Sequence, residues 1–150
     1  MGKNLQDHLM FRPVYKLKNI KSLNRDVESL YSKFLMGIQY ILKQSGPITM
    51  GASQVCAFTK SDPSRATPNL QFHVQPLSTD ILGVTPMHNF EGITPTVANI
   101  RPTSRGEINI TSNDSRDNPK IKMNYLSTED DRIVAAKSLK LVRKIMLETE

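Results

Sequence analysis

The chain has 150 residues, of which 38% are hydrophobic and 23% are charged, and these values are typical of a folded domain. The single cysteine, Cys56, excludes an internal disulfide framework and any metal site built from cysteines alone. The net charge of +6 is concentrated near the start, because residues 1–25 hold six lysines or arginines against one aspartate. That excess would suit nucleic acid or an anionic membrane, but no aromatic platform is interleaved with the lysines of residues 16–21, so a solvated surface is favoured.

The first third of the chain predicts an extended segment followed by a helix. In residues 8–18 apolar and polar side chains alternate, and Pro13 favours an edge position for such a strand. Residues 24–43 place apolar side chains at spacings of three and four, which predicts an amphipathic helix with one apolar face. Either Asn24 or Ser22 is expected to cap its start.

Two strands and a long loop are predicted in the middle of the chain. Residues 55–59 form a short apolar run, in which Cys56 fits a small core position better than a nucleophile. Residues 70–75 alternate strictly, so one face should pack on the core while the other is wet or lines a polar cavity. Residues 76–96 contain three prolines and two glycines and predict a long loop, a kind of segment that is often functional.

The remainder of the chain predicts three more strands and a final helix. Strands are expected at residues 97–101, 106–111 and 120–124. From Ser127 onward, acidic residues precede lysines and arginines, and apolar residues recur at helical spacing. Ser127 is expected to cap this helix, with Asp130 completing a variant of the capping box.

No catalytic motif is complete within the chain. The three histidines, His8, His73 and His88, lack the spacing of metal ligands, and each is interpreted as a hydrogen-bonded structural residue. The sequence contains no G-x-S-x-G elbow, no Walker loop and no G-x-G-x-x-G dinucleotide turn. Composition and spacing therefore predict an α+β domain with no self-contained catalytic site and no metal site.

Four segments form an ordered set of motifs. Residues 2–8 read GKNLQDH, residues 68–73 read PNLQFH, and residues 101–110 read RPTSRGEINI. Residues 112–130 contain Ser-Asn-Asp, a proline, Asn-Tyr-Leu and an aspartate. In this order they resemble G-x-N-L-Q-D-H, P-D-x-Q-x-H, R-P-x-S-R-G-x-I-x-L and S-x-D-P…P-x-I-x-x-N-Y-L…D of the glucose–methanol–choline (GMC) flavin oxidoreductases, choline and alcohol dehydrogenases among them.

The resemblance implies a domain organisation as well as a fold. Residues 9–150 match most of the family's substrate-binding domain, a mostly antiparallel sheet flanked by helices. Residues 1–8 match the junction that follows the FAD-binding part. The family's FAD-binding glycine turn lies upstream of this junction, and its catalytic histidine, with a second histidine or asparagine, lies downstream of residue 150. We therefore expect FAD in a full-length protein, and no catalytic residue in this chain.

The resemblance also suggests which side chains form the wall of the substrate site. Gln54 falls where choline-specific relatives tend to carry a glutamate. A neutral amide lacks the Coulomb attraction for a quaternary ammonium ion, which favours a neutral primary alcohol over choline. The expected wall residues are Gln54, His73, Gln75 and Arg101.

Other residues within the motifs are expected to hold the backbone in place. Asp7 and His8 should tie the junction to the domain, and they are the weaker candidates for contact with the flavin. Arg105 is expected to fix a turn by bonding carbonyl groups or a carboxylate. Gly106 should permit a close approach of the backbone or a special dihedral angle.

Three functions follow from these patterns. The first is the substrate-binding portion of an FAD-dependent enzyme that oxidises a primary alcohol to an aldehyde by hydride transfer, inactive as the isolated chain. The second is a non-catalytic domain of the same descent that binds a small molecule or a partner protein. The third is a basic module for nucleic acid or membranes. We favour the first, which implies a small alcohol, the missing flavin domain and no nucleic acid as partners. It also implies an acceptor that can be membrane-associated, and a cytoplasmic location that can be peripheral to the membrane.

Overall fold

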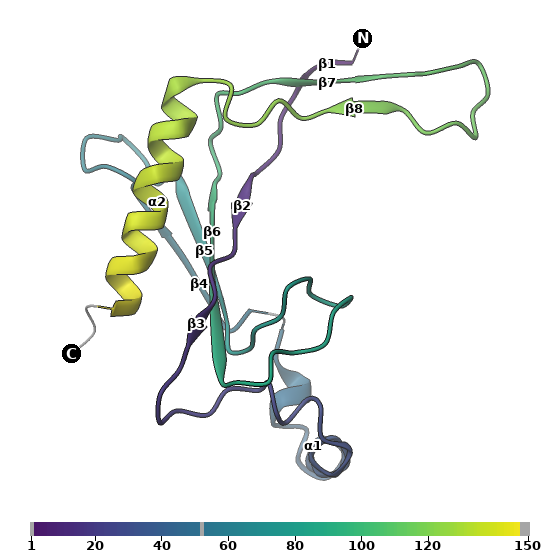
Figure 1. The fold of residues 1–150 in the computed structure, drawn as a ribbon, viewed down its shortest axis with the longest axis vertical. Coiled ribbons are helices and arrows are strands. Elements are labelled where there is room, and N and C mark those ends of the chain that lie inside the picture. The colour runs from purple at the N-terminus through teal and green to yellow at the C-terminus, as the bar shows by residue number, and fades with distance from the viewer. Residues whose placement is uncertain (1, 52, 148–150) are drawn as a thin grey trace. The chain divides into compact units, whose positions relative to one another are not determined.

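A computed structural model describes residues 2–51 and 53–147 (Figure 1). The chain divides into two compact units. Strands β4 (Val55–Thr59), β5 (Leu70–Gln75) and β6 (Gly92–Asn99) each contribute residues to both units. Among the described residues, unit 1 comprises 2–11, 58–71 and 97–147, and unit 2 comprises 12–51, 53–57 and 72–96.

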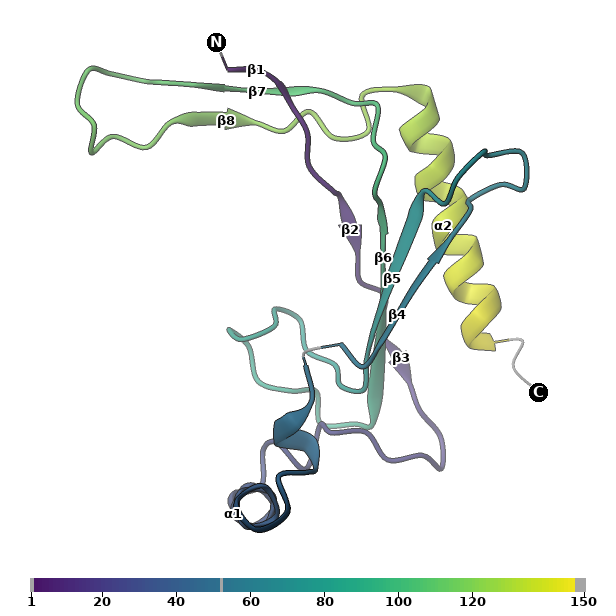
Figure 2. The ribbon, with the colours of Figure 1, turned by 180° about the vertical axis from the view of Figure 1, so that it is seen from behind.

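Two sheets are present among the described residues. The larger has the strand order β2-β6-β5-β4, and β3 (Tyr15–Lys16) also pairs with β6. Strand β2 (Met10–Phe11) pairs antiparallel with the end of β6, and β3 pairs antiparallel with its start. The smaller sheet contains β1 (Lys3–Leu5), β7 (Gly106–Asn109) and β8 (Lys120–Lys122), with β7 and β8 forming a long antiparallel hairpin (Figure 2). The predicted α+β class and antiparallel pairing are confirmed.

The core of unit 1 is contributed by β5, β6 and helix α2 (Glu129–Leu147). The predicted cap of α2 is wrong by one residue. Thr128, not Ser127, accepts the helix N–H of Asp131 through its hydroxyl at 3.4 Å, and Ser127 instead donates its own N–H to Ser104. The buried apolar side chains of unit 1 are Leu70, Val97, Ala98, Val134 and Val142.

Helix α1 (Leu30–Lys43) of unit 2 begins six residues later than predicted. Its cap is Ser29, whose hydroxyl accepts the N–H of Ser32 at 3.2 Å. The two expected caps have other partners: Ser22 donates to the carboxylate of Glu91, and Asn24 is fully buried. These tertiary contacts hold the residues that precede Ser29 in turns.

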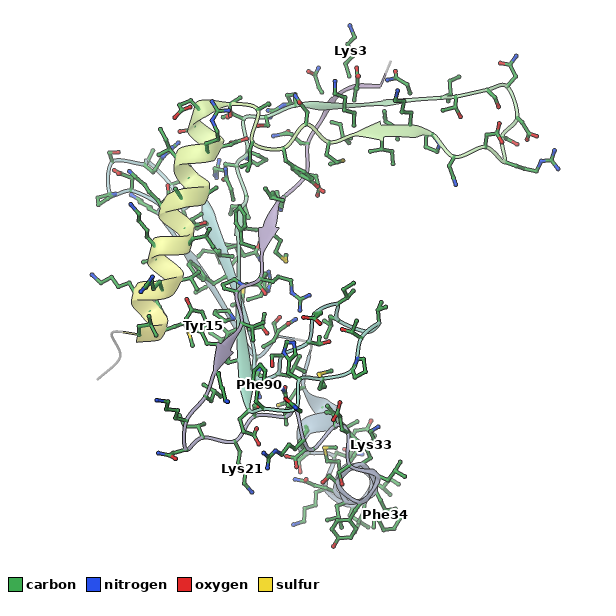
Figure 3. All side chains as sticks on the ribbon, viewed as in Figure 1. Lys3, Tyr15, Lys21, Lys33, Phe34 and Phe90 are labelled. Atoms are coloured by element: carbon green, nitrogen blue, oxygen red, sulfur yellow. The ribbon has the colours of Figure 1, made fainter. Side chains whose placement is uncertain are left out.

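The apolar face of α1 points away from unit 2. Leu30 is 83% exposed and Ile41 is 77% exposed, and Phe34 extends into open space (Figure 3). The half-buried residues of the helix are Ser32, Met36 and Gly37. An amphipathic helix usually packs its apolar face against the rest of its domain. In unit 2, α1 instead directs its apolar face away from the unit.

The predicted loop over residues 76–96 ends earlier, because β6 begins at Gly92 rather than at Val97. Pro95 lies inside this strand. Glu91 accepts a backbone hydrogen bond from Leu17 on the β3 side, and the two-residue period places Pro95 on that same side. Pro95 lies between the residues of β6 that pair with β3 and those that pair with β2. Because Pro95 is not paired with a described residue of β2 or β3, the backbone N–H that proline lacks is not required there.

Two predicted strands match the structure at both ends. They are β4 over residues 55–59 and β5 over residues 70–75. The expectation that Cys56 occupies a core position is wrong, because Cys56 is exposed on β4. Strand β4 lies at the edge of its sheet, so an apolar run there need not be buried. The strands expected at 106–111 and 120–124 are β7 and β8, each shorter than predicted.

Candidate functional site

A hollow of about 500 Å³ lies in unit 2 between the segment before α1 and the start of β4. Gln54 lines it together with Lys21 and Asp26. The 3-10 turn η1 (Pro47–Thr49) closes one side. Gly46 has a φ of +98° at the entrance to this turn, and a Cβ there would lie 2.7 Å from the side chain of Gln39. Only glycine fits this position.

Two backbone hydrogen bonds hold the walls of the hollow together. The N–H of Leu23 donates to the carbonyl of Pro76 at 2.8 Å. The N–H of Gln54 donates to the carbonyl of Val74 at 3.0 Å, which ties the start of β4 to β5. The amide group of Gln54 contacts the sulfur of Met50. Gln54 therefore offers the hollow a neutral polar group that can both donate and accept hydrogen bonds.

The other expected wall residues do not line this hollow. Gln75 is only 8% exposed, and its side-chain oxygen accepts from Nη2 of Arg12 at 3.3 Å. His73 is half-buried on β5, two residues from Gln75 and on the same face. Arg101 belongs to unit 1, where its Nε donates to the carbonyl of Pro68 at 3.3 Å. Of the four residues, the structure places only Gln54 at the hollow.

Two motif residues of unit 1, Asp7 and Arg105, have structural contacts of the kind expected for them. Asp7 accepts a hydrogen bond from the hydroxyl of Tyr125, which lowers the pKa of Asp7 and raises that of Tyr125. Arg105 donates from Nη1 to the carbonyls of Pro102 at 2.8 Å and Ser104 at 3.0 Å, as predicted for a residue that fixes a turn. His8 is exposed.

Sequence reasoning missed the buried polar centre of unit 2. Asn24 donates to the carbonyls of His88 at 3.1 Å and Phe90 at 2.7 Å, and it accepts the N–H of Ser78 at 2.7 Å. The sequence offers no signal for this set, because Asn24 lies 54 to 66 residues before its partners. Asn24 adjoins Leu23, which lines the hollow, so this centre holds the wall in place.

His88 joins this centre to the surface, which agrees with its interpretation as a structural histidine. Its Nδ1 lies 3.1 Å from Ser78 Oγ, and its Nε2 lies 3.2 Å from Asp80 Oδ1. Because an ionised carboxylate can only accept, we assign the proton of the neutral ring to Nε2, and Nδ1 then accepts from the Ser78 hydroxyl. The imidazole also stacks on Phe90 with ring centroids 4.9 Å apart.

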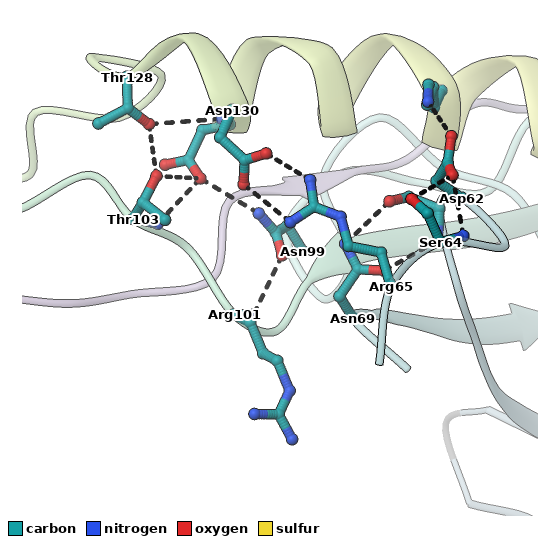
Figure 4. Close-up of polar contacts among 12 residues, drawn as sticks. Asp62, Ser64, Arg65, Asn69, Asn99, Arg101, Thr103, Thr128 and Asp130 are labelled. Atoms are coloured by element: carbon teal, nitrogen blue, oxygen red, sulfur yellow. Dashed lines mark hydrogen bonds and ion pairs between the residues drawn. The ribbon is translucent and has the colours of Figure 1, made fainter. Parts of the chain in front are cut away.

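Unit 1 contains a second polar network, at the start of α2 (Figure 4). The carboxylate of Asp130 pairs with the guanidinium of Arg65. The neighbouring Asp131 accepts from the backbone N–H groups of Thr103 at 2.9 Å and Ser104 at 2.8 Å. This network attaches the segment after β6 to the helix, and so positions the backbone that carries Arg101 and Arg105.

Comparison with known proteins relates the chain to oxidoreductases. A family model described as GMC oxidoreductase matches residues 102–150. The chain is 34% identical, over 148 residues, to the oxygen-dependent choline dehydrogenase of Vibrio vulnificus (strain YJ016). It is 32% identical, over 150 residues, to the protein of the same name from Proteus mirabilis (strain HI4320). Each match covers 99% of this chain and 26% of the relative, so the chain spans about a quarter of these proteins.

Solved structures share the fold. The chain superimposes on formate oxidase with a TM-score of 0.82 and 18% identity, covering 98% of this chain and 30% of that chain. For pyridoxine 4-oxidase from Mesorbium loti the TM-score is 0.70 with 21% identity, covering 97% of this chain and 25% of that chain. The two sheets and two helices described above are thus an α+β arrangement found within oxidases. The family model over residues 102–150 and the sequence relatives agree with the resemblance of the motifs to the GMC oxidoreductases.

Two properties of the described residues bear on cofactors and membranes. No group of three or more histidine, cysteine, aspartate or glutamate side chains among them could hold a metal ion. Across residues 2–51 and 53–147, no helix has both the length and the apolar character that crossing a membrane requires.

Proposed function

We propose that this chain forms part of the substrate wall of an FAD-dependent oxidoreductase that converts a neutral primary alcohol to an aldehyde. The observation that carries the proposal is Gln54 in the wall of the unit 2 hollow. An uncharged amide can bind a hydroxyl group by donating to it or accepting from it. His73, Gln75 and Arg101 do not line this hollow, and their contact with substrate in a complete protein stays a prediction from the family resemblance.

We assign the flavin to other parts of a complete protein, an assignment supported by the charge at the start of α2. Phosphate groups bind helix N-termini through unpaired N–H groups and the positive end of the helix dipole. The first turn of α2 carries Glu129, Asp130 and Asp131, whose negative charge opposes a phosphate. When bound, FAD would supply the hydride acceptor, and the residues of this chain would orient the alcohol.

A chimera tests this proposal. The 150 residues would replace the matching quarter of the Vibrio vulnificus relative, and flavin reduction would be followed by absorbance under anaerobic conditions. We expect a neutral primary alcohol to reduce the bound flavin, and choline to do so less efficiently. A chimera that holds flavin but is reduced by no alcohol would contradict the proposal.

The role of Gln54 has its own variant and control in the chimera. Gln54→Glu restores a negative charge at the wall, and we expect it to favour choline over a neutral alcohol by at least about tenfold in kcat/KM. Asn113→Asp makes the same chemical change on the exposed hairpin of unit 1 and should leave the ratio unchanged. Equal effects of the two variants would exclude Gln54 from the site.

A further inference from the structure

A second, apolar hollow adjoins the one that Gln54 lines. It has a volume of about 280 Å³ and lies in unit 2 between α1, η1 and the end of β5. Every described residue that lines it is a glycine or has an apolar side chain, and Val27, Met36 and Leu77 belong to its walls. The two hollows adjoin each other, because Leu23, Pro47, Met50 and Pro76 line both.

We propose that the apolar hollow binds the aliphatic tail of the alcohol substrate while its hydroxyl end lies beside Gln54. This inference rests on the proposed function and names the class of alcohol: a straight-chain primary alcohol with several methylene groups. The polarity of the two hollows supports it. Lys21, Asp26 and Gln54 line the first, and no charged or amide side chain is among the described residues that line the second.

The walls of the apolar hollow suit a tail of variable shape. Met36 extends from the half-buried face of α1, and Met50 lies where the two hollows meet. Methionine side chains are unbranched and polarizable, so they adapt to different apolar ligands. Choline has a permanent charge and no aliphatic tail, and it would leave the apolar hollow unfilled. The structure therefore predicts that tail length, rather than positive charge, determines affinity.

The size of the effect follows from the hydrophobic transfer of methylene groups. Each methylene removed from water strengthens binding by up to about fourfold. Affinity should therefore rise steeply along the series from butanol to decanol and level off once the hollow is full. On the outward apolar face of α1, Leu30 is 83% and Ile41 is 77% exposed, so a tail lying there would stay largely in contact with water.

Calorimetric titration of the full 150-residue chain with this alcohol series tests the inference without flavin. We expect the dissociation constant to fall by about two- to fourfold per methylene, and choline to bind more weakly than hexanol. Met36→Gln should flatten the dependence on tail length. The matched control is Ile41→Gln on the exposed face of α1, which should preserve it. If Met36→Gln lowers the melting temperature strongly, Val27→Thr changes the same wall with less change in volume.

Three outcomes would overturn the tail site. They are affinities independent of chain length, equal flattening by Ile41→Gln, and choline binding as tight as that of octanol. The chimera experiment measures flavin reduction, whereas the titration measures binding of the alcohol. A length-dependent series together with a flavin that no alcohol reduces would leave an aliphatic-ligand site and reject the oxidation. Flavin reduction without length dependence would reject the tail site alone.

Discussion

The carboxylate of Asp131 accepts a 2.8 Å hydrogen bond from the backbone N–H of Ser104, which lies 27 residues earlier in the chain. The same carboxylate accepts from the N–H of Thr103 at 2.9 Å and from Nδ2 of Asn99 at 3.3 Å. Asp131 is only 4% exposed and lies in the first turn of α2, where the helix dipole favours negative charge. One carboxylate thus accepts hydrogen bonds from two backbone N–H groups in the segment that follows β6.

Asp131→Asn should destabilise the chain by about 2–4 kcal/mol, because an amide cannot accept all of these hydrogen bonds and its NH₂ group faces other donors. Urea unfolding followed by circular dichroism measures this change. The adjacent Asp130→Asn is the matched control. It weakens a partly exposed ion pair with Arg65 and should cost less than about 1 kcal/mol. Similar losses for the two variants would contradict the assigned role of Asp131.

Acid should remove the contribution of Asp131. Burial by itself raises the pKa of Asp131, but hydrogen bonds from Ser104 and Thr103 outweigh burial, and the pKa lies below its ordinary value of 3.8. A carboxyl group with a lowered folded-state pKa contributes stability above its unfolded-state pKa and loses it as the pH falls through the folded-state value. Urea midpoints should therefore decline below about pH 4, and less steeply in Asp131→Asn. Parallel declines would show that other carboxyl groups cause the acid sensitivity.

Two glycines should respond in opposite ways to substitution by alanine. A Cβ at Gly106 would lie 2.2 Å from the carbonyl oxygen of Lys122 and 2.6 Å from that of Met123, so the hairpin backbone would have to move. Gly106→Ala should destabilise by about 1–3 kcal/mol. A Cβ at Gly37 in α1 would meet no atom within 4 Å, and Gly37→Ala should stabilise by about 0.5–1 kcal/mol through helix propensity. Thermal melting of both variants measures the difference, and a stabilised Gly106→Ala would refute the close approach.

Removing the side chain of Asn24 should loosen the loop that follows β5. Asn24→Ala leaves the carbonyls of His88 and Phe90 and the N–H of Ser78 without their buried partner. We expect a loss of about 2–4 kcal/mol, and faster amide hydrogen exchange at residues 78–90. Asn113→Ala on the exposed hairpin should change neither property. Unchanged exchange in Asn24→Ala would mean that the loop is held by other contacts.

Local patterns predicted strands better than helix ends. The alternation over residues 70–75 located β5 at both ends, because a period of two depends only on neighbouring residues. The start of α1 was misplaced because Asn24 and Ser22 are good caps in isolation. Their actual partners, Glu91 and the loop from Ser78 to Phe90, lie more than 50 residues away, and no local pattern could reveal them.

The candidate site also combines a feature that the sequence predicts with features that it does not predict. Resemblance to a family predicts Gln54 as a wall residue, and Gln54 lines a hollow in the structure. The apolar hollow beside it had no signal in the sequence, since Val27, Met36 and Leu77 look like ordinary core residues of separate segments. Likewise, the inverted orientation of α1 could not be predicted, because periodicity defines an apolar face but not the direction in which that face points.

The α+β class, most of the strands and the family motifs can be predicted without a structure, because they depend on residue type and on spacing within short segments. Tertiary structure alone decided where α1 begins and what its two faces meet. It also decided which polar side chains are buried together and which apolar residues line a common hollow. Each of these depends on contacts between segments far apart in the chain, and such contacts arise only when the free energy of the whole fold selects one arrangement.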